Sequence, residues 1–350
     1  MTNRFGYSFL AMLVGFTFIM SLPSCKKDKD IDINQILGRY VIVSGGYTAA
    51  KYLEITSDTM YFMEESGNYG KRGLEAVPFT FTEENIDFWS TLRSYSYNDG
   101  EIAIDSLYGS NTFIAVKNSN VPATSQWVHT TTVTDLGPLP GVIGNPIGDM
   151  TSFYGNVVTD GVDNGTEYVF KNLTISGSSI TANEIPIEPF YTSEVGYANN
   201  IEFMGNKFLV YSWGSPSNFY SIDPFTGNVI IAIPVNNDPG YIYAIAFDGS
   251  NLYGMSYDGI LKFDFVNDEW GNEIRVGGAG TLAGKDGYLY LTNQSENIIQ
   301  KYDPLQHKVV GAYSIPQYYS LNGMAFLGNN ILASAYDYNT GNYTIIRIVL

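Results

Sequence analysis

The sequence is poor in cysteine, histidine and positive charge, and each shortage excludes a kind of chemistry. One cysteine in 350 residues cannot form a disulfide within the chain, and the two histidines, His129 and His307, lie far apart in the sequence. A histidine-rich metal site is therefore not expected. The 18 Lys and Arg residues face 35 Asp and Glu residues, which leaves a net charge of −17. Because phosphate backbones bind cationic surfaces, this balance argues against a nucleic-acid partner.

Aromatic rings and glycine are abundant instead. Aromatic residues make up 15% of the chain, with 28 Tyr and 20 Phe, and glycine accounts for 36 residues. Aromatic residues favour strands, and glycine favours the tight turns between them. The hydrophobic share of 45% is enough to fill cores, and a length of 350 residues suits about two domains. We therefore expect an all-β protein with two domains.

The first 24 residues have the parts of a secretory signal. Arg4 supplies a positive start, and an uncharged, mainly apolar run of 18 residues follows at 5–22. The alternative is a transmembrane helix, since a run of this length can just span a bilayer. The only cysteine favours the signal, because residues 22–25 (LPSC) resemble the bacterial lipoprotein signal, which is cut before a cysteine that then carries lipid. This resemblance implies a signal peptide at 1–24 and a membrane anchor through lipid on Cys25.

A short charged segment follows Cys25. Residues 26–30 read KKDKD, and we expect 25–30 to form a tether. Charged runs at this place resemble those that send Bacteroidota lipoproteins to the cell surface, whereas a plain solvated tether would leave the protein at the periplasmic face. The resemblance implies an outer-membrane, lipid-anchored protein exposed at the cell surface.

The first predicted domain covers residues 31–117. About eight short strand-like runs separated by polar turns predict a small, closed or nearly closed barrel. The opening at 37–40 (LGRY) and the hairpin at 53–61 resemble the small lipocalin-like domains of Bacteroidota lipoproteins. The resemblance implies a barrel that holds a small apolar ligand, but small barrels are often filled by their own side chains. We expect the filled interior.

The second predicted domain covers residues 118–350 and contains internal repeats. Four segments of the form strand, glycine turn, strand place their turn glycines at 205, 249, 287 and 328, spaced 44, 38 and 41 residues apart. Four strands in about 40 residues is the period of a β-propeller. A more degenerate copy at 150–187 raises the number of blades to five, and a sixth would have to fit into 118–146. The repeat resembles the streptogramin-lyase-like and quinoprotein-like propellers.

The last copy lacks a fourth strand. Its third strand lies at 343–348, close to the end of the printed sequence, and residues 127–133 (WVHTTTV) form a strand-like run near the start of the domain. We expect this run to complete the fifth blade and close the ring.

One face of the predicted propeller is rich in aromatic side chains. The loops that join successive blades gather on the same face as the loops between the second and third strands of each blade. Rings with a polar tip suit the binding of sugars or peptide chains. The alternative is that many of these rings pack between blades. The predicted ligand-binding residues are Tyr191, Tyr197, Trp213, Tyr241, Tyr243, Tyr257, Tyr318, Tyr319, Tyr336 and Tyr338.

Catalytic and metal-binding patterns are much weaker. A glycosidase needs two carboxylates across a cleft, and although Asp149 and Glu202 are candidates to point into a central channel, nothing in the sequence pairs them. Asp160, Asp163 and Asn164 offer oxygen ligands, but they lack the spacing of a calcium loop. We assign no catalytic residue and no metal ligand, and we expect no cofactor, with calcium as the alternative.

These observations favour a non-catalytic binding protein at the outer membrane that uses its propeller face to bind a glycan or an outer-membrane protein. Two alternatives stay open. One is a polysaccharide-active hydrolase or lyase on the propeller, and the other is a docking component of an outer-membrane complex.

Overall fold

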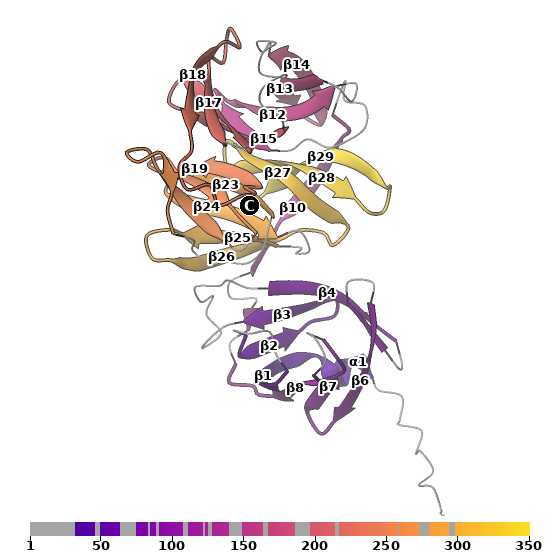
Figure 1. The fold of residues 1–350 in the computed structure, drawn as a ribbon. Coiled ribbons are helices and arrows are strands. Elements are labelled where there is room, and N and C mark those ends of the chain that lie inside the picture. The colour runs from indigo at the N-terminus through magenta and orange to yellow at the C-terminus, as the bar shows by residue number, and fades with distance from the viewer. Residues whose placement is uncertain are drawn as a thin grey trace, which may run out of the picture.

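The computed structural model describes residues 32–45, 50–63, 75–82, 85–88, 91–107, 111–121, 123–124, 128–139, 149–163, 167–185, 197–213, 217–257, 259–272, 280–293 and 298–350. The predicted signal peptide, Cys25 and the tether lie outside these residues. The described chain forms an eight-stranded closed barrel followed by a five-bladed β-propeller (Figure 1). The prediction of an all-β protein with these two architectures is confirmed.

The barrel is a simple meander in which each strand pairs with the next in antiparallel fashion. It closes where the first strand pairs with the last, with Tyr40 opposite Lys117. A single helical turn, α1 (Ile33–Ile36), precedes it. The strands are β1 (Gly38–Ser44), β2 (Tyr52–Ile55), β3 (Thr59–Met63), β4 (Glu75–Phe81), β5 (Asn85–Phe88), β6 (Thr91–Asn98), β7 (Glu101–Ile104) and β8 (Phe113–Lys117).

Buried side chains from all around the barrel meet in its interior. Alternate residues of the strands point inward, as the pleat of a strand requires, so that Leu53 and Ile55 of β2 are buried while their neighbours are less so. They join one cluster with Tyr40, Phe62 and Phe113, which are also buried. The described part of the barrel thus has a core of its own side chains.

The propeller consists of five sheets around a common axis. The innermost strands β11, β15, β19, β23 and β27 pack side by side in a closed ring. The strands are β11 (Met150–Phe153), β12 (Asn156–Asp163), β13 (Glu167–Ser176) and β14 (Ser179–Ile185) in blade 1; β15 (Tyr197–Met204), β16 (Lys207–Trp213), β17 (Asn218–Ile222) and β18 (Val229–Pro234) in blade 2; β19 (Ala244–Phe247), β20 (Leu252–Met255), β21 (Ile260–Asp264) and β22 (Glu269–Trp270) in blade 3; β23 (Gly280–Lys285), β24 (Tyr288–Asn293), β25 (Ile298–Asp303) and β26 (Lys308–Ser314) in blade 4; and β27 (Tyr319–Leu327), β28 (Asn330–Asp337) and β29 (Asn342–Val349) in blade 5.

The repeated glycines have a conformational reason. Gly205, Gly249, Gly287 and Gly328 all lie in the turn between the first and second strands of their blades, with φ angles of 72°, 104°, 80° and 63°. A side chain at such angles is strained, so these glycines fix the hairpin that repeats from blade to blade.

The closing strand differs from the prediction. The chain divides the predicted run 127–133 between two blades: β9 (Val128–Thr130) adds a fifth, parallel strand to β26 of blade 4, and β10 (Thr132–Gly137) pairs with β29 and completes blade 5. Both pieces are rich in Val and Thr, which suit strands, and the outer strand of blade 4 offers hydrogen-bonding groups that the first piece reaches on its way. The prediction was right that a strand from the domain's start closes the ring, but wrong about which residues form it.

Blade 2 differs from blade 4 at the position where this additional strand pairs. The outer strands β18 and β26 both carry a bulge near their start and then re-pair at Ile231 and Gly311. Ser314, three residues beyond Gly311, pairs with β9. The matching position in β18 is Pro234, which has no N–H to donate to a further strand. In blade 3 the fourth strand, β22, is the short segment Glu269–Trp270.

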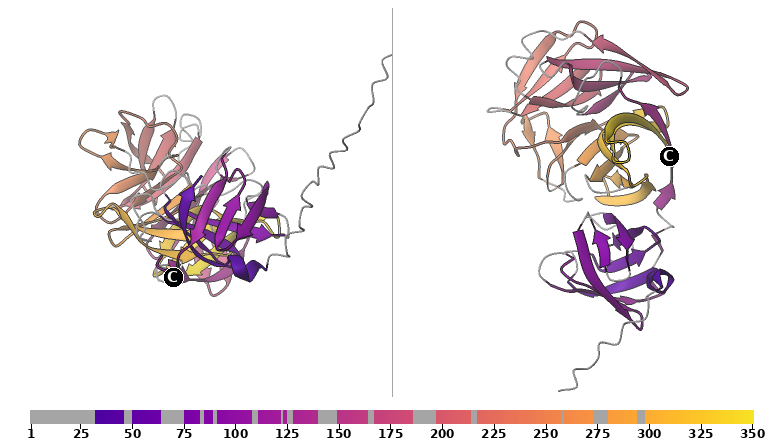
Figure 2. Two further views of the ribbon diagram at one scale, coloured as in Figure 1. Left: turned by 90° about the horizontal axis from the view of Figure 1, so that it is seen from below. Right: turned by 90° about the vertical axis from the view of Figure 1, so that its right-hand side faces the viewer.

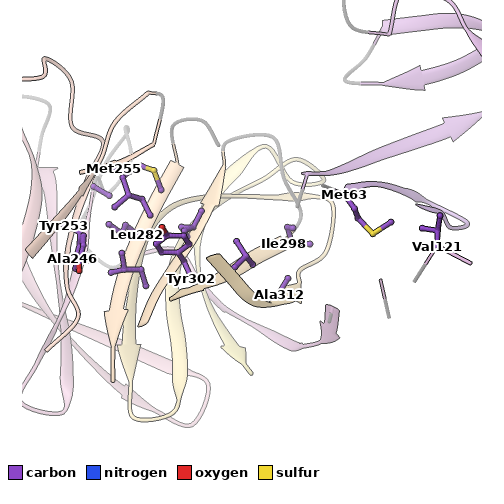
Figure 3. Packing of buried hydrophobic residues seen from close by; sticks show 14 residues of the cluster. Met63, Val121, Ala246, Tyr253, Met255, Leu282, Ile298, Tyr302 and Ala312 are labelled. Atoms are coloured by element: carbon purple, nitrogen blue, oxygen red, sulfur yellow. The ribbon is translucent and has the colours of Figure 1, made fainter. Parts of the chain in front are cut away.

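The barrel packs against the rim of the propeller at blade 4, and Figure 1 and the right-hand view of Figure 2 show it beside the propeller. Met63 and Val121 belong to the same buried cluster as Ile298 and Ala312 of that blade (Figure 3). The side-chain amide of Gln317 also donates a hydrogen bond of 2.9 Å to the backbone oxygen of Asp58 in the barrel. Apolar burial and a direct hydrogen bond therefore both join the two regions.

Candidate binding face

The loops between blades and the loops between second and third strands lie at one end of the propeller, because antiparallel strands reverse direction at each turn. We call this end the tyrosine face. Tyr241, Tyr257 and Tyr338, from blades 3 and 5, are 59%, 71% and 64% exposed there. Tyr243 and Tyr318 are less exposed but still reach solvent. Five of the ten predicted residues thus present rings to solvent at this end.

At the tyrosine face, blade 5 has several contacts between aromatic rings. The rings of Tyr318 and Tyr319 lie 4.5 Å apart between centroids, and the ring of Tyr336 lies 5.1 Å from Tyr338 and 5.0 Å from Tyr343. The N–H of Tyr338 donates a hydrogen bond of 2.8 Å to the backbone oxygen of Tyr318, which joins the two loops. The exposed rings of this blade therefore rest on two groups of aromatic side chains, whose loops the backbone hydrogen bond joins.

Two rings in these groups differ from the prediction of exposed binding residues. Tyr319 is buried, and burial, with smaller contributions from the Asp135 charge and other nearby groups, raises the pKa of its hydroxyl to about 12. Tyr343 was not among the predicted residues. Its register opposite Tyr336 in the last hairpin is the sequence signal that would have found it.

On the side of blade 3, Asp238 organises the loop that carries Tyr241 and Tyr243. The Tyr211 hydroxyl donates to Asp238 Oδ1 at 2.9 Å, and the Ser217 hydroxyl donates to Asp238 Oδ2. The carboxylate also accepts the N–H of Gly240 at 2.9 Å. Burial raises the pKa of the Tyr211 hydroxyl, which keeps it a donor. The side chain of Asp238 thus builds the loop.

The structure does not describe the side chains of three other predicted residues. Tyr191 lies outside the described residues. Tyr197 and Trp213 face each other at the ends of β15 and β16, and their side chains also lie outside what the structure describes. Asp160 and Asp163 lie in β12, and Asn164 follows it outside the described part. No group of His, Cys, Asp or Glu residues among the described positions is arranged to hold a metal ion.

The two carboxylates considered for a central channel, those of Asp149 and Glu202, lie near the axis and form hydrogen bonds with backbone groups. Asp149 is buried and accepts the N–H of Met150 at 2.9 Å and the N–H of Ile245 at 3.1 Å, so that it joins blade 1 to blade 3. Burial raises the pKa of Glu202 well above its ordinary value, although hydrogen bonds from Thr151 and from the Phe247 backbone act in the opposite direction. These side chains tie the inner strands together.

Further polar contacts cross between the inner strands. The N–H of Phe203 donates to the Thr151 hydroxyl at 2.8 Å, and the Asn200 side-chain amide donates to the Ile242 oxygen at 2.7 Å. At Gly284 the backbones approach so closely that a Cβ atom would lie 2.1 Å from the Phe247 oxygen. The axis is therefore a packed hydrogen-bonded region in the part of the chain that the structure describes.

Known proteins resemble this chain only distantly and only in structure. No family model and no curated protein matches the chain. Similar solved structures are glutaminyl cyclase from Myxococcus xanthus (9% identity, TM-score 0.45, covering 63% of this chain and 98% of that one), BamB from Moraxella catarrhalis (10%, 0.33, 84% and 82%) and the PQQ-bound aldose sugar dehydrogenase from Streptomyces coelicolor (12%, 0.34, 74% and 90%). At these identities a likeness concerns the fold alone, and the five-bladed ring rests on the strand topology itself.

Among the described residues, no helix is long and apolar enough to cross a membrane.

Proposed function

We propose that this chain is a lipid-anchored, cell-surface protein of the outer membrane that binds a glycan on its tyrosine face without catalysing a reaction. The observation that carries the proposal is the exposure of Tyr241, Tyr257 and Tyr338 at one end of the propeller. An exposed ring keeps apolar surface in contact with water, which is unfavourable, and a bound ligand can cover that surface. A tyrosine ring also combines a flat apolar face with a hydroxyl. Sugars present the same combination of apolar faces and hydroxyl groups.

The arrangement of the loops supports a rigid site. Asp238 holds the loop of blade 3, and the hydrogen bond between Tyr338 and Tyr318 holds the two loops of blade 5. Side chains fixed before binding lose little conformational freedom when a ligand arrives. The axial carboxylates Asp149 and Glu202 already serve the backbone, which favours binding over hydrolysis as the role of this end.

The anchor is the second part of the proposal. Cleavage before Cys25 and lipidation of that residue would leave residues 25–30 as a tether, 31–117 as a lipocalin-like barrel domain and 118–350 as the propeller domain. The support is the sequence at 22–25, which resembles a lipoprotein signal, and the charged segment that follows it. A globomycin-sensitive shift in mass, abolished by Cys25→Ala, tests the anchor separately from glycan binding.

A glycan array tests the binding face directly. The chain from residue 26 should bind one class of glycan saturably, and Tyr257→Ala and Tyr338→Ala should each weaken binding about tenfold, because each removes an exposed ring. Phe225→Ala, at the opposite end of the propeller, is the matched control and should bind as the parent does. Tyr257→Phe separates the ring from its hydroxyl.

The outcomes are distinct. No binding by a folded sample would contradict the glycan proposal. Binding that is equally strong in both tyrosine variants would place the site elsewhere. Release of shortened products from the bound glycan would show a polysaccharide-active enzyme, and loss of that release in Glu202→Gln would assign the carboxyl to it.

A further inference from the structure

The opposite end of the propeller carries apolar side chains at equivalent turns. In blades 2, 3 and 4, the turn between the third and fourth strands begins with an aspartate, Asp223, Asp264 or Asp303. Each carboxylate accepts the N–H of the residue two positions later, at 2.8, 2.8 and 2.9 Å. The same local hydrogen bond therefore builds all three turns and points the same position outward.

That position is apolar in all three blades. Phe225, Val266 and Leu305 are 70%, 89% and 85% exposed. Turn tips favour small or polar residues, so one apolar side chain would need no explanation, but three at equivalent positions form a pattern. We call these three residues the turn tips.

Blade 1 adds a fourth apolar group to this end. Tyr154 has a φ of 42° in the turn between β11 and β12, and its exposed ring stacks on Phe225 with centroids 6.2 Å apart and planes inclined by 18°. In the matching turn of blade 4, the left-handed residue before Gly287 is Asp286, which tolerates this backbone far better than a tyrosine does. The strained Tyr154 extends the row of tips to the neighbouring blade.

We propose that the turn tips dock into apolar sockets of a protein whose surrounding surface is positively charged. This inference is independent of the tyrosine face and its glycan. The partner's positive charge is inferred from the turns at this end, where acidic side chains outnumber basic ones among the described residues. They are Asp223, Asp248, Asp264, Asp268, Asp286 and Asp303 against Lys207, Lys285 and Lys308, with Arg347 also at this end, where its guanidinium donates to the Gly177 oxygen.

The same charges disfavour two other occupants. A second copy meeting this end face to face would bring acidic turns against acidic turns, and an anionic lipid surface would repel them. A cationic partner gains both from the apolar contacts and from the field, and its association should slow as salt screens the charges.

Site-specific photo-crosslinking on intact cells that produce the full chain tests the proposal. A benzophenone amino acid replaces Val266 or Leu305 in separate variants, and Asn206, an exposed polar residue in a turn at the same end, is the matched control. We expect Val266 and Leu305 to give an adduct with the same foreign polypeptide and Asn206 to give none.

The captured polypeptide is then purified and titrated with the parent chain. Binding should weaken about tenfold in Val266→Asp and in Leu305→Asp, and should weaken further as salt rises from about 0.05 to 0.5 M. These side chains are exposed, so unchanged thermal unfolding of both variants verifies that the propeller is intact. Adducts with lipid or with a second copy, the absence of any tip-specific adduct, or binding insensitive to both variants and salt would each overturn the proposal.

Discussion

The two ends of the propeller differ in the kind of apolar surface they expose. The tyrosine face presents rings that each end in a hydroxyl, such as Tyr257 and Tyr338, whereas the turn tips present Phe225, Val266 and Leu305, which have no polar atom in their side chains. Only the first kind can hydrogen-bond a hydrated ligand while covering its apolar face, and the second is satisfied only by another apolar surface. Under the two proposals the ends therefore take different ligands, although the same blades build both.

Both ends depend on the packed axis between them, and breaking it should have the largest effect. Asp149→Ala leaves the N–H groups of Met150 and Ile245 without their acceptor in a buried place. We expect a loss of about 3 kcal/mol in the free energy of unfolding, measured by urea titration. Asp149→Asn keeps one acceptor oxygen and should lose less. If Asp149→Ala unfolds like the parent, the axis does not hold the blades together.

Alkaline pH should destabilise the folded protein through its buried tyrosines. Burial is the main cause that raises the pKa of Tyr253, Tyr290 and Tyr319 to about 12 in the folded protein. The unfolded chain ionises near pH 10, so stability is full below that value and falls as the pH rises from 10 towards 12. At pH 11 each such tyrosine should cost about 1 kcal/mol of stability.

A matched pair of variants isolates this effect. Tyr290→Phe should reduce the difference in unfolding free energy between pH 9 and pH 11 by about 1 kcal/mol. Tyr257→Phe, at an exposed position of the tyrosine face, is the matched control. Equal behaviour of the two variants would contradict the contrast between buried and exposed rings.

The smallest effect concerns acid pH at the turn tips. Backbone hydrogen bonds hold the pKa of Asp223 and of Asp264 below its ordinary value of 3.8. Such a group contributes stability above the unfolded pKa, and the contribution disappears as the pH falls through the lower folded value. Asp264→Ala should therefore lower the melting temperature slightly at pH 6 and not at pH 2. A difference that grows towards acid pH would have the wrong sign.

Much of the fold follows from local patterns in the sequence. The glycine turns at 205, 249, 287 and 328 gave the blade period, and the alternating runs of the first domain gave the eight strands of the barrel. Both signals are local, because a left-handed turn residue and a two-residue pleat act within a few positions.

The parts that sequence patterns missed depend on partners distant in the chain. Residues 128–130 and 132–137 have the same strand-like pattern in the sequence. They belong to different blades because residues 128–130 pair with the outer edge of blade 4, whereas residues 132–137 pair with β29 of blade 5. The burial of Tyr319 and the hydrogen bond from the N–H of Ile245 to Asp149 likewise depend on residues of other blades. The turn tips did carry a signal, an aspartate followed two positions later by an apolar residue, but it becomes visible only when the blades are aligned by structure.

The pairing of β10 with β29 sets the order in which this molecule can be completed. During synthesis from the N-terminus, β10 is made about 200 residues before the strand that it joins, since Thr132 pairs with Val349. The barrel strands, which pair mostly with their immediate neighbours, have what they need much earlier. The barrel can thus fold before β29 is synthesised, whereas the ring is completed only afterwards. A chain that lacked β29 would keep its barrel, and β10 would lose its partner.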